Sequence, residues 1–238
     1  MKITTAATSW RAARPKNRPR TNTIQQATHI DCMPEPKRKG QRICLFGGTF
    51  DPIHEAHLRI AQEALATFSL DTVLFIPAAN PPHKDPSAIT PYEDRLHMVE
   101  IACGPYPHFE PSRLEEGAER SYTVQTLRRF KQQLAPDYEL FFLIGSDAFE
   151  EIETWKDWRD VVAMTEFIVV SRPGAEYRIA EHARVHRLAG PHLDVSSSTI
   201  RARLAAGEPT PELPDPVRQF IEEHGLYGFG NNQIAAEP

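Results

Sequence analysis

The feature of this sequence that most constrains its fold is a repeated alternation, after residue 40, of short apolar runs with longer stretches of helical spacing. Apolar runs typical of buried strands cover residues 42–46, 72–76, 138–144 and 167–170, with weaker candidates near residue 109 and at 184–188. Apolar residues three or four apart predict helices at 52–68, 92–102, 123–134, 197–206 and 216–224. This alternation favours a single parallel sheet with helices on both faces, a doubly wound α/β fold with closing helices at its C-terminal end.

Charge divides the chain near residue 40. Residues 1–39 carry nine basic and two acidic side chains, a net of +7, whereas the whole chain of 238 residues has a net charge of −5. Because this segment has few large apolar residues and no clear period, we expect a disordered basic tail at 1–39 and one folded domain at 40–238. Two interpretations of the tail stay open: a transit-like peptide, or an addition without a role, including a misassigned start with Met33 as the initiator.

The composition argues against several classes of protein. A net charge of −5 disfavours a general nucleic-acid binder. No apolar run of the sequence approaches the roughly 18–20 residues that a membrane helix needs. The cysteines Cys32, Cys44 and Cys103 have neither CxxC spacing nor an even count, so they predict reduced thiols in a cytoplasmic protein without a zinc site.

The junction between the first predicted strand and the first predicted helix is suited to phosphate. Gly47 and Gly48 would let the backbone approach a ligand without a Cβ atom in the way. Asp51 and Pro52 fit a helix start, as N-cap and first helical residue. The free N–H groups of a helix N-terminus attract anions.

Two histidines follow within the first turns of that helix. His54 and His57 are three residues apart, so we expect them on one face. Each feature has an ordinary alternative: a turn, a cap, an isolated surface histidine or half of a metal site. Their combination in this order instead favours a site for the spread negative charge of phosphoryl transfer.

In this order the segment resembles a known signature. GGTFDPIHEAH at residues 47–57 is similar to the GGTFDPxHxGH signature of the HxGH nucleotidyltransferase superfamily, and more narrowly of the bacterial nicotinate-nucleotide adenylyltransferases. The resemblance implies a Rossmann-like nucleotidyltransferase domain at 40–238. Ala56 replaces a glycine of the signature and remains a good helix former. The resemblance also implies ATP contacts from this segment at Gly47, Gly48, Thr49, Phe50, His54 and His57.

Two further segments resemble motifs of the same family. IPAANPPHK at residues 76–84 resembles its IPxxxPPHK loop, although the residues alone also fit a rigid proline loop with an exposed basic tip. SYTVQTL at residues 121–127 resembles its SYTxxTL segment, although a capped helix start explains the hydroxyl groups equally well. In the family these segments bind phosphate and, through backbone donors, the nicotinate group. The resemblance thus implies nicotinate mononucleotide contacts at Thr49, His83, Lys84, Tyr122, Thr123 and Trp155.

The C-terminal half completes the resemblance. Gly145 and Asp147 follow the strongest predicted strand, where open α/β sheets bind ligands. Trp155 matches a tryptophan that stacks on the pyridine ring, whereas we expect Trp158 in the core. DVSSSTIR at residues 194–201 resembles the superfamily's ISSTxIR motif, a second anion site. The remaining implied ATP contacts are Gly145, Asp147, Ser197, Ser198 and Arg201.

The resemblance implies in-line attack by the phosphate of nicotinate mononucleotide on the α-phosphorus of ATP, without a side-chain base. The implied catalytic residues are His54, His57, Lys84 and Arg201, and Mg²⁺ would arrive with ATP rather than at a dedicated metal site. We expect no nucleic-acid or membrane partner, and a homo-oligomer stays open. The alternatives are another acceptor, such as nicotinamide mononucleotide or phosphopantetheine, an inactive nucleotide-binding regulator, and a fragment of a class I aminoacyl-tRNA synthetase. The enzyme interpretation requires the histidines and Arg201 to meet in one cleft.

Overall fold

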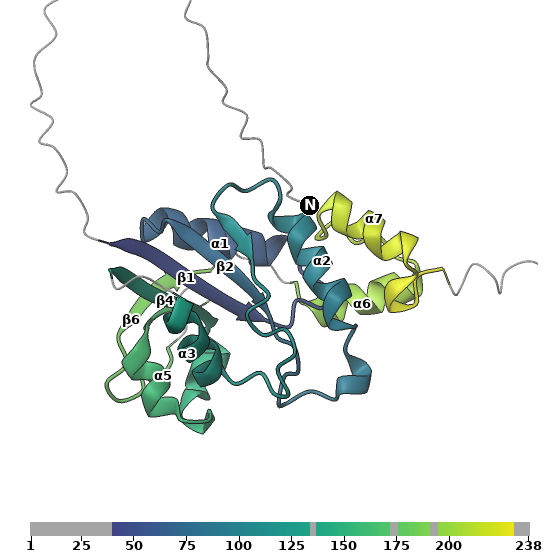
Figure 1. Cartoon of the computed structure of the whole chain (residues 1–238). Helices are drawn as coiled ribbons and strands as arrows, with labels where there is room; N and C mark the ends of the chain where they lie inside the picture. Colours follow the sequence, from purple (N-terminus) through teal and green to yellow (C-terminus); the bar gives the residue numbers. More distant parts are fainter. Residues whose placement is uncertain (1–39, 134–136, 172–175, 191–194, 231–238) are drawn as a thin grey trace, which may run out of the picture. The chain divides into compact units, whose positions relative to one another are not determined.

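The computed structural model describes residues 40–133, 137–171, 176–190 and 195–230. The tail predicted at 1–39, with Met33, lies outside the described residues. Six parallel strands form one sheet in the order β3-β2-β1-β4-β5-β6 (Figure 1). The strands are β1 (Gln41–Gly48), β2 (Thr72–Pro77), β3 (Phe109–Pro111), β4 (Tyr138–Gly145), β5 (Glu166–Ser171) and β6 (Val185–Ala189). The predicted strands and their parallel arrangement are confirmed.

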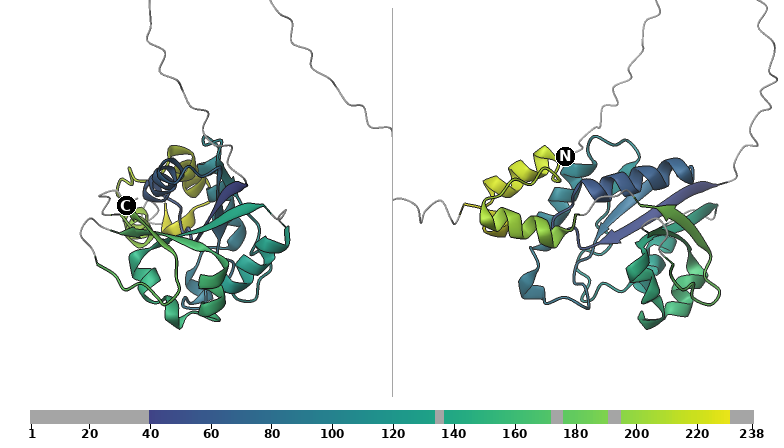
Figure 2. Two further views of the ribbon diagram at one scale, coloured as in Figure 1. Left: turned by 90° about the vertical axis from the view of Figure 1, so that its left-hand side faces the viewer. Right: turned by 180° about the vertical axis from the view of Figure 1, so that it is seen from behind.

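Helices cover both faces of this sheet, as the two views of Figure 2 show. One face packs against α1 (Glu55–Thr67), α2 (Tyr92–Cys103), α6 (Ser197–Ala206) and α7 (Asp215–Glu223). The other packs against α3 (Thr123–Gln133), α4 (Ser146–Glu150) and α5 (Trp158–Met164). The doubly wound fold with closing C-terminal helices is therefore confirmed.

The alternation of side chains along the strands explains the two layers. In β1, Cys44 and Phe46 belong to one apolar cluster, while Ile43 and Leu45 belong to the other. Successive strand residues point to opposite faces, so a run that is apolar throughout must be covered twice. The continuous apolar runs in the sequence are the direct signal of this burial.

The strand order reverses at the centre of the sheet. β2 and β3 lie on one side of β1, and β4, β5 and β6 lie on the other. Connections on the two sides leave in opposite directions, which opens a crevice beyond the carboxyl ends of the two central strands. Gly47 and Gly48 end β1 and Gly145 ends β4, so all three glycines lie at this crevice.

The first helix begins later than the sequence predicted. Its first residue is Glu55 and its N-cap is His54, so the assignment of Asp51 as N-cap and Pro52 as first helical residue is wrong. Asp51 and Pro52 instead form a turn with a cis peptide bond between them. The Asp51 carboxylate accepts hydrogen bonds from the Tyr227 hydroxyl (2.8 Å) and from a backbone N–H outside the helix, so it is engaged elsewhere.

Several short elements also differ from expectation. Residues 77–91 contain one turn of 3₁₀ helix, η1 (Pro86–Ala88), where the prolines predicted no regular structure. The Asp85 carboxylate accepts from the Ser87 N–H at 2.9 Å and caps this turn. α4, α5 and two further 3₁₀ turns, η2 (Ile152–Thr154) and η3 (Leu226–Gly228), were not predicted.

Candidate active site

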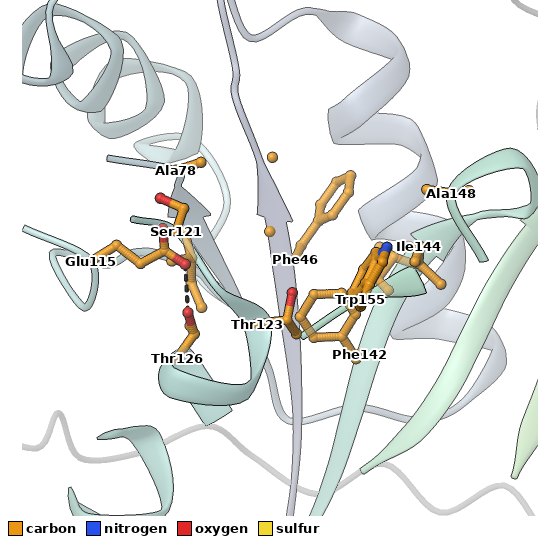
Figure 3. A pocket seen from close by; sticks show the side chains of 15 residues that line it. Phe46, Ala78, Glu115, Ser121, Thr123, Thr126, Phe142, Ile144, Ala148 and Trp155 are labelled. Carbon is orange, nitrogen blue, oxygen red and sulfur yellow. Dashed lines mark hydrogen bonds between the residues drawn. The ribbon is translucent and has the colours of Figure 1, made fainter. Parts of the chain in front are cut away.

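A cavity of about 250 Å³ lies at the crevice between β1 and β4. Figure 3 shows it between an aromatic side, with Trp155 and Phe142, and a polar side, with Glu115 and Ser121. Of the predicted site residues, the following line it: Gly47, Gly48, Thr123, Gly145 and Trp155. The structure therefore brings together residues that are widely separated in the sequence.

Trp155 forms the aromatic side with Phe142. It follows η2, and its ring meets that of Phe142 edge to face, with centroids 6.4 Å apart and planes at 80°. Such contacts fix the indole orientation and leave part of the indole surface toward the cavity. Trp155 thus offers an apolar surface on which a flat ring can lie. Trp158, expected in the core, is partly buried and packs at the edge of the same apolar cluster.

The polar side is organised by a carboxylate that sequence reasoning missed. Glu115 is 8% exposed and lines the cavity. It accepts a hydrogen bond from the Thr126 hydroxyl (2.5 Å) and one from the Ala79 N–H (3.3 Å). A buried carboxylate needs such donors. Glu115 thereby joins the loop after β2 to helix α3.

Asn80 makes a second connection between the same two segments. Its N–H donates to the Ser121 hydroxyl oxygen and the Ser121 N–H donates to its carbonyl oxygen, both at 2.9 Å. The loop that bears Lys84 is therefore tied to the segment that begins α3. A ligand that moves one segment must also move the other.

The two glycines after β1 are required by close contacts. A Cβ atom on Gly48 would stand 2.9 Å from the Phe50 ring, and one on Gly47 would stand 3.3 Å from the Phe142 ring. Phe50 is buried and has a left-handed backbone with φ 48°. This conformation folds its ring back beneath the end of the strand. The backbone at Gly48 is thus open on its cavity side and filled on the other.

His54 and His57 form a stacked pair at the start of α1. Their ring centroids are 3.8 Å apart with an interplanar angle of 26°. The backbone N–H of His54 donates to Nδ1 of His57 at 3.2 Å. Nδ1 of His57 is therefore an acceptor, which places the proton of the neutral ring on Nε2. The predicted common face is confirmed, one turn earlier on the helix than expected.

Both imidazoles are neutral near pH 7. Burial lowers the pKa of His54 to about 4, partly opposed by the carboxylate of Glu212. Burial also lowers the pKa of His57 well below its usual value, and His54 lowers it further. Nδ1 of His54 is buried and has no hydrogen-bond partner among the described residues. The pair thus offers neutral donors rather than positive charge.

The second predicted anion segment contacts the turn beside the histidines. A guanidinium nitrogen of Arg201 donates to the backbone carbonyl of Asp51 at 2.6 Å. The Ser197 hydroxyl donates to the carbonyl of Pro52 at 3.0 Å. These bonds join positions about 150 residues apart in the chain, so the N-termini of α1 and α6 come together. The two predicted segments therefore contact each other through the turn at residues 51–52.

Cations gather around this junction. Burial, and then the Arg201 guanidinium, lower the pKa of the Lys84 ammonium, while the nearby Asp51 carboxylate raises it. Arg95 is 1% exposed and donates to the carbonyls of Thr49 (2.7 Å) and Thr90 (2.8 Å). Three basic groups face one buried carboxylate, an excess of positive charge that suits an anionic ligand.

Other predicted residues lie at the edges of this arrangement. The Tyr122 N–H donates to the Arg120 carbonyl at 3.1 Å, so the backbone donor that the resemblance implies there is engaged in a turn. The Tyr122 ring lies beneath the Lys156 ammonium, 4.6 Å away. Among the predicted site residues that the structure describes, the following do not line the cavity: Thr49, Phe50, His54, His57, His83, Lys84, Tyr122, Asp147, Ser197, Ser198 and Arg201.

Sequence reasoning missed three residues that organise the site: Arg95, Glu115 and Tyr227. Arg95 carried a readable signal, because it lies on the helical face of Met98, Val99 and Ala102, all buried. A basic residue in an apolar stripe indicates a buried, hydrogen-bonded charge. Glu115 and Tyr227 carried no such signal, because their partners lie in other segments.

Within the described part of the chain, no group of three or more His, Cys, Asp or Glu side chains is placed to hold a metal ion. No helix there has the length and apolar character to span a membrane.

Comparison with known proteins gives concordant matches. The model of the cytidylyltransferase-like family matches residues 45–203. A protein of Solibacter usitatus, named probable nicotinate-nucleotide adenylyltransferase, is 50% identical over 186 residues, which cover 78% of this chain and 99% of that protein. One with the same name from Geobacter sulfurreducens is 40% identical over 209 residues, covering 77% and 96%.

A solved structure supports the fold. Nicotinic acid mononucleotide adenylyltransferase of Plasmodium falciparum, in complex with NaAD, superimposes with a TM-score of 0.67. The two sequences are 22% identical, and the match covers 80% of this chain and 99% of that one. At this level of identity the likeness concerns the fold alone.

Proposed function

This chain belongs to the nicotinate-nucleotide adenylyltransferases, within the cytidylyltransferase-like family, and from that premise we infer its reaction. It is an enzyme that transfers the AMP moiety of ATP to nicotinate mononucleotide, giving nicotinate adenine dinucleotide and pyrophosphate. The observation that carries this inference is the junction of the turn at residues 51–52 with Ser197 and Arg201, beside a cavity with an aromatic side.

The triphosphate of ATP is proposed to lie at that junction. Lys84 and Arg201 would supply positive charge, and His54 and His57 would supply neutral donors. Because Nδ1 of His57 accepts from the His54 N–H, the donor of His57 is its Nε2–H. Donors that are fixed before the reaction stabilise the charge that develops on the transferred phosphoryl group and on the leaving pyrophosphate. The acceptor phosphate is already an anion, so no base is needed.

The pyridine ring of the acceptor is proposed to lie in the cavity against Trp155. The aromatic surface there suits an electron-poor ring, Ser121 supplies a polar group on the opposite side, and Thr123 supplies one beside Phe142. Gly145 would leave room for the nucleotide at the end of β4, while Gly47 and Gly48 would bring the backbone of β1 close to it. Thr49, Phe50, His83, Tyr122, Asp147 and Ser198 are proposed at the margins, on the strength of the family resemblance.

Mg²⁺ is proposed to arrive on the ATP phosphates. The donor set at the junction is mainly cationic, with the Asp51 carboxylate engaged by Tyr227 and the Glu212 carboxylate near His54, and this fits a metal held by phosphate oxygens. We also place the reaction in the cytoplasm, since Cys44 and Cys103 are free thiols in this fold. Residues 40–238 are proposed as the nucleotidyltransferase domain, with 1–39 as a separate tail.

The test is pyrophosphate release from ATP with three acceptors measured side by side. Nicotinate mononucleotide should give the highest kcat/KM, above nicotinamide mononucleotide and phosphopantetheine. Trp155→Ala should raise KM for nicotinate mononucleotide at least about tenfold through the lost stacking surface. Trp158→Phe serves as the control outside the cavity. Preference for phosphopantetheine in the wild-type enzyme would refute the assigned acceptor.

A further inference from the structure

The segment after α7 returns to the turn that follows β1. In this segment, η3, the Tyr227 hydroxyl donates to Oδ1 of Asp51 at 2.8 Å, across 176 positions of sequence. Asp51 is 4% exposed, so this bond satisfies a buried carboxylate. Burial raises the pKa of Tyr227, and the Asp51 carboxylate raises it further, so the hydroxyl stays a donor.

Asp51 is a junction between the C-terminal segment and Arg201. Its carboxylate accepts from Tyr227, while its backbone carbonyl accepts from the Arg201 guanidinium at 2.6 Å. The Thr90 N–H approaches its other carboxylate oxygen at 3.5 Å. A shift of Asp51 would therefore displace the proposed pyrophosphate-binding arginine.

The backbone of Tyr227 is in an unusual conformation. Its φ is 58° and its ψ is 25°, in the left-handed region that bulky residues seldom adopt. Two glycines beside Tyr227 in this segment are also left-handed: Gly225, which precedes η3, has φ 59°, and Gly228, its last residue, has φ 76°. Strain of this kind persists only where surrounding contacts impose it, and it is concentrated at functional sites. The strained tyrosine is held by its contact with the turn.

We infer that Tyr227 is a positioning residue, which acts through Asp51 to hold the turn at residues 49–52 and, with it, Arg201 in the arrangement that receives the triphosphate. This role rests on the proposed function for its catalytic consequence. Its structural part, the restraint of the turn by a hydroxyl from the far end of the chain, does not depend on the substrate.

The test compares Tyr227→Phe with Tyr106→Phe in the full chain. Both tyrosines are partly buried and pack against the same apolar cluster, but Tyr106 stacks on Phe109 away from the turn. Amide hydrogen exchange is measured over residues 49–58, where the His54 and Glu55 N–H groups are hydrogen-bonded. Tyr227→Phe should speed exchange in this peptide at least about fivefold, and Tyr106→Phe should leave it unchanged.

Kinetics supply the second measurement. Tyr227→Phe should lower kcat about tenfold, with KM for the acceptor changed less than about twofold, because the hydroxyl bonds to a charged group and not to substrate. Asp51→Ala should lower kcat similarly, and the double variant should show less than the product of the two effects, since both changes remove the hydrogen bond between Tyr227 and Asp51.

Each result supports or overturns the proposed role of Tyr227. Unchanged exchange over residues 49–58 in Tyr227→Phe overturns the proposal whatever the substrate is. Faster exchange with unchanged kcat in an active enzyme, or a lower melting temperature alone, overturns the positioning role and leaves only a structural one. A wild-type protein that releases no pyrophosphate with nicotinate mononucleotide refutes the proposed function, while the exchange data still decide whether Tyr227 restrains the turn.

Discussion

His54 and His57 contribute a fixed hydrogen-bonding geometry rather than positive charge. Burial lowers both pKa values, so neither ring contributes a positive charge near pH 7. The stacked arrangement and the His54 N–H bond to Nδ1 of His57 fix which nitrogen of His57 donates. Positive charge at the junction comes instead from Lys84 and Arg201. The sequence predicted these four residues as one catalytic group but suggested no division of labour among them.

His57→Ala should lower kcat at least about a hundredfold, because the removal of one fixed donor to a developing charge costs that much in comparable sites. The far-UV circular dichroism spectrum should stay that of the wild type, since alanine is a good helix former at this position, although the His57 ring contacts Phe46 and Phe50. His97→Ala is the matched control: His97 is an exposed histidine of α2 that pairs with Glu100. Wild-type turnover in His57→Ala would refute the assigned role.

Stability should depend on pH through His54. Its pKa is about 4 in the folded chain and about 6.5 when unfolded, so below pH 6.5 the unfolded chain binds more protons. The free energy of unfolding should therefore fall as the pH drops from 6.5 toward 4, by about 2 kcal/mol between pH 7 and pH 5 from this group alone. Urea denaturation at several pH values measures this change in the free energy of unfolding.

The control for this pH dependence is His54→Asn, which cannot titrate in this range. Between pH 7 and pH 5, the free energy of unfolding of this variant should fall by about 2 kcal/mol less than that of the wild type, because the His54 titration is absent. Equal slopes for the two proteins would show that folding does not lower the pKa of His54.

At the scale of elements, the ends of the two central strands differ in the space that they leave for a side chain. A Cβ atom on Gly145 would meet nothing within 4 Å, and the backbone there has φ −72°, which alanine adopts freely. A Cβ atom on Gly48 would meet the Phe50 ring at 2.9 Å. Glycine at 48 is required by the fold, whereas glycine at 145 leaves room for a ligand.

This contrast predicts different results for two similar substitutions. Gly145→Ala should leave the melting temperature unchanged and raise KM for ATP about tenfold, because the methyl group enters space proposed for the nucleotide. Gly48→Ala should destabilise the fold by about 1–3 kcal/mol through overpacking. Thermal melts and steady-state kinetics on both variants measure these effects. Unchanged kinetics in Gly145→Ala would place the nucleotide elsewhere.

Sequence reasoning found the elements that are long enough to show an apolar run or a helical period. β4 and β1 were predicted because residues 140–144 and 43–46 are unbroken apolar runs, and a helix of 13 residues such as α1 shows its period clearly. α4 and α5, with five and seven residues, are too short to show a period. The start of α1 was misplaced because Asp51 resembles an N-cap but bonds to Tyr227 instead.

Site residues divided in a similar way. His54, His57 and Arg201 were predictable because their motifs are contiguous and resemble a known signature. Glu115 and Tyr227 were not, because each acts on a partner in another segment, and a single sequence does not reveal that pairing. Tyr227 also lies beyond residues 45–203, the part that the family model matches.

At the scale of the whole molecule, stability depends on the closing helix α7. Val217 and Ile221 are fully buried and Phe220 is 9% exposed, all against the cluster that α1 and α2 share. Burial of three such side chains contributes roughly 5–9 kcal/mol, comparable with the total stability of a typical domain.

A chain that ends at residue 214 should therefore be unfolded or marginally stable at 25 °C. A chain that ends at residue 230 is the control, because it keeps α7 and Tyr227. Differential scanning calorimetry should show a cooperative transition for the longer chain and a weak or absent one for the shorter. A cooperative transition at the same temperature in both would contradict the assigned contribution of α7.

The bonds from Arg201 and Tyr227 to Asp51 also determine when, during synthesis, the enzyme becomes competent. A growing chain displays the two histidines once its first quarter has emerged, but both side chains that steady the neighbouring turn are translated near the end. Incomplete or prematurely terminated products therefore carry the histidine signature without the two side chains that bond to Asp51.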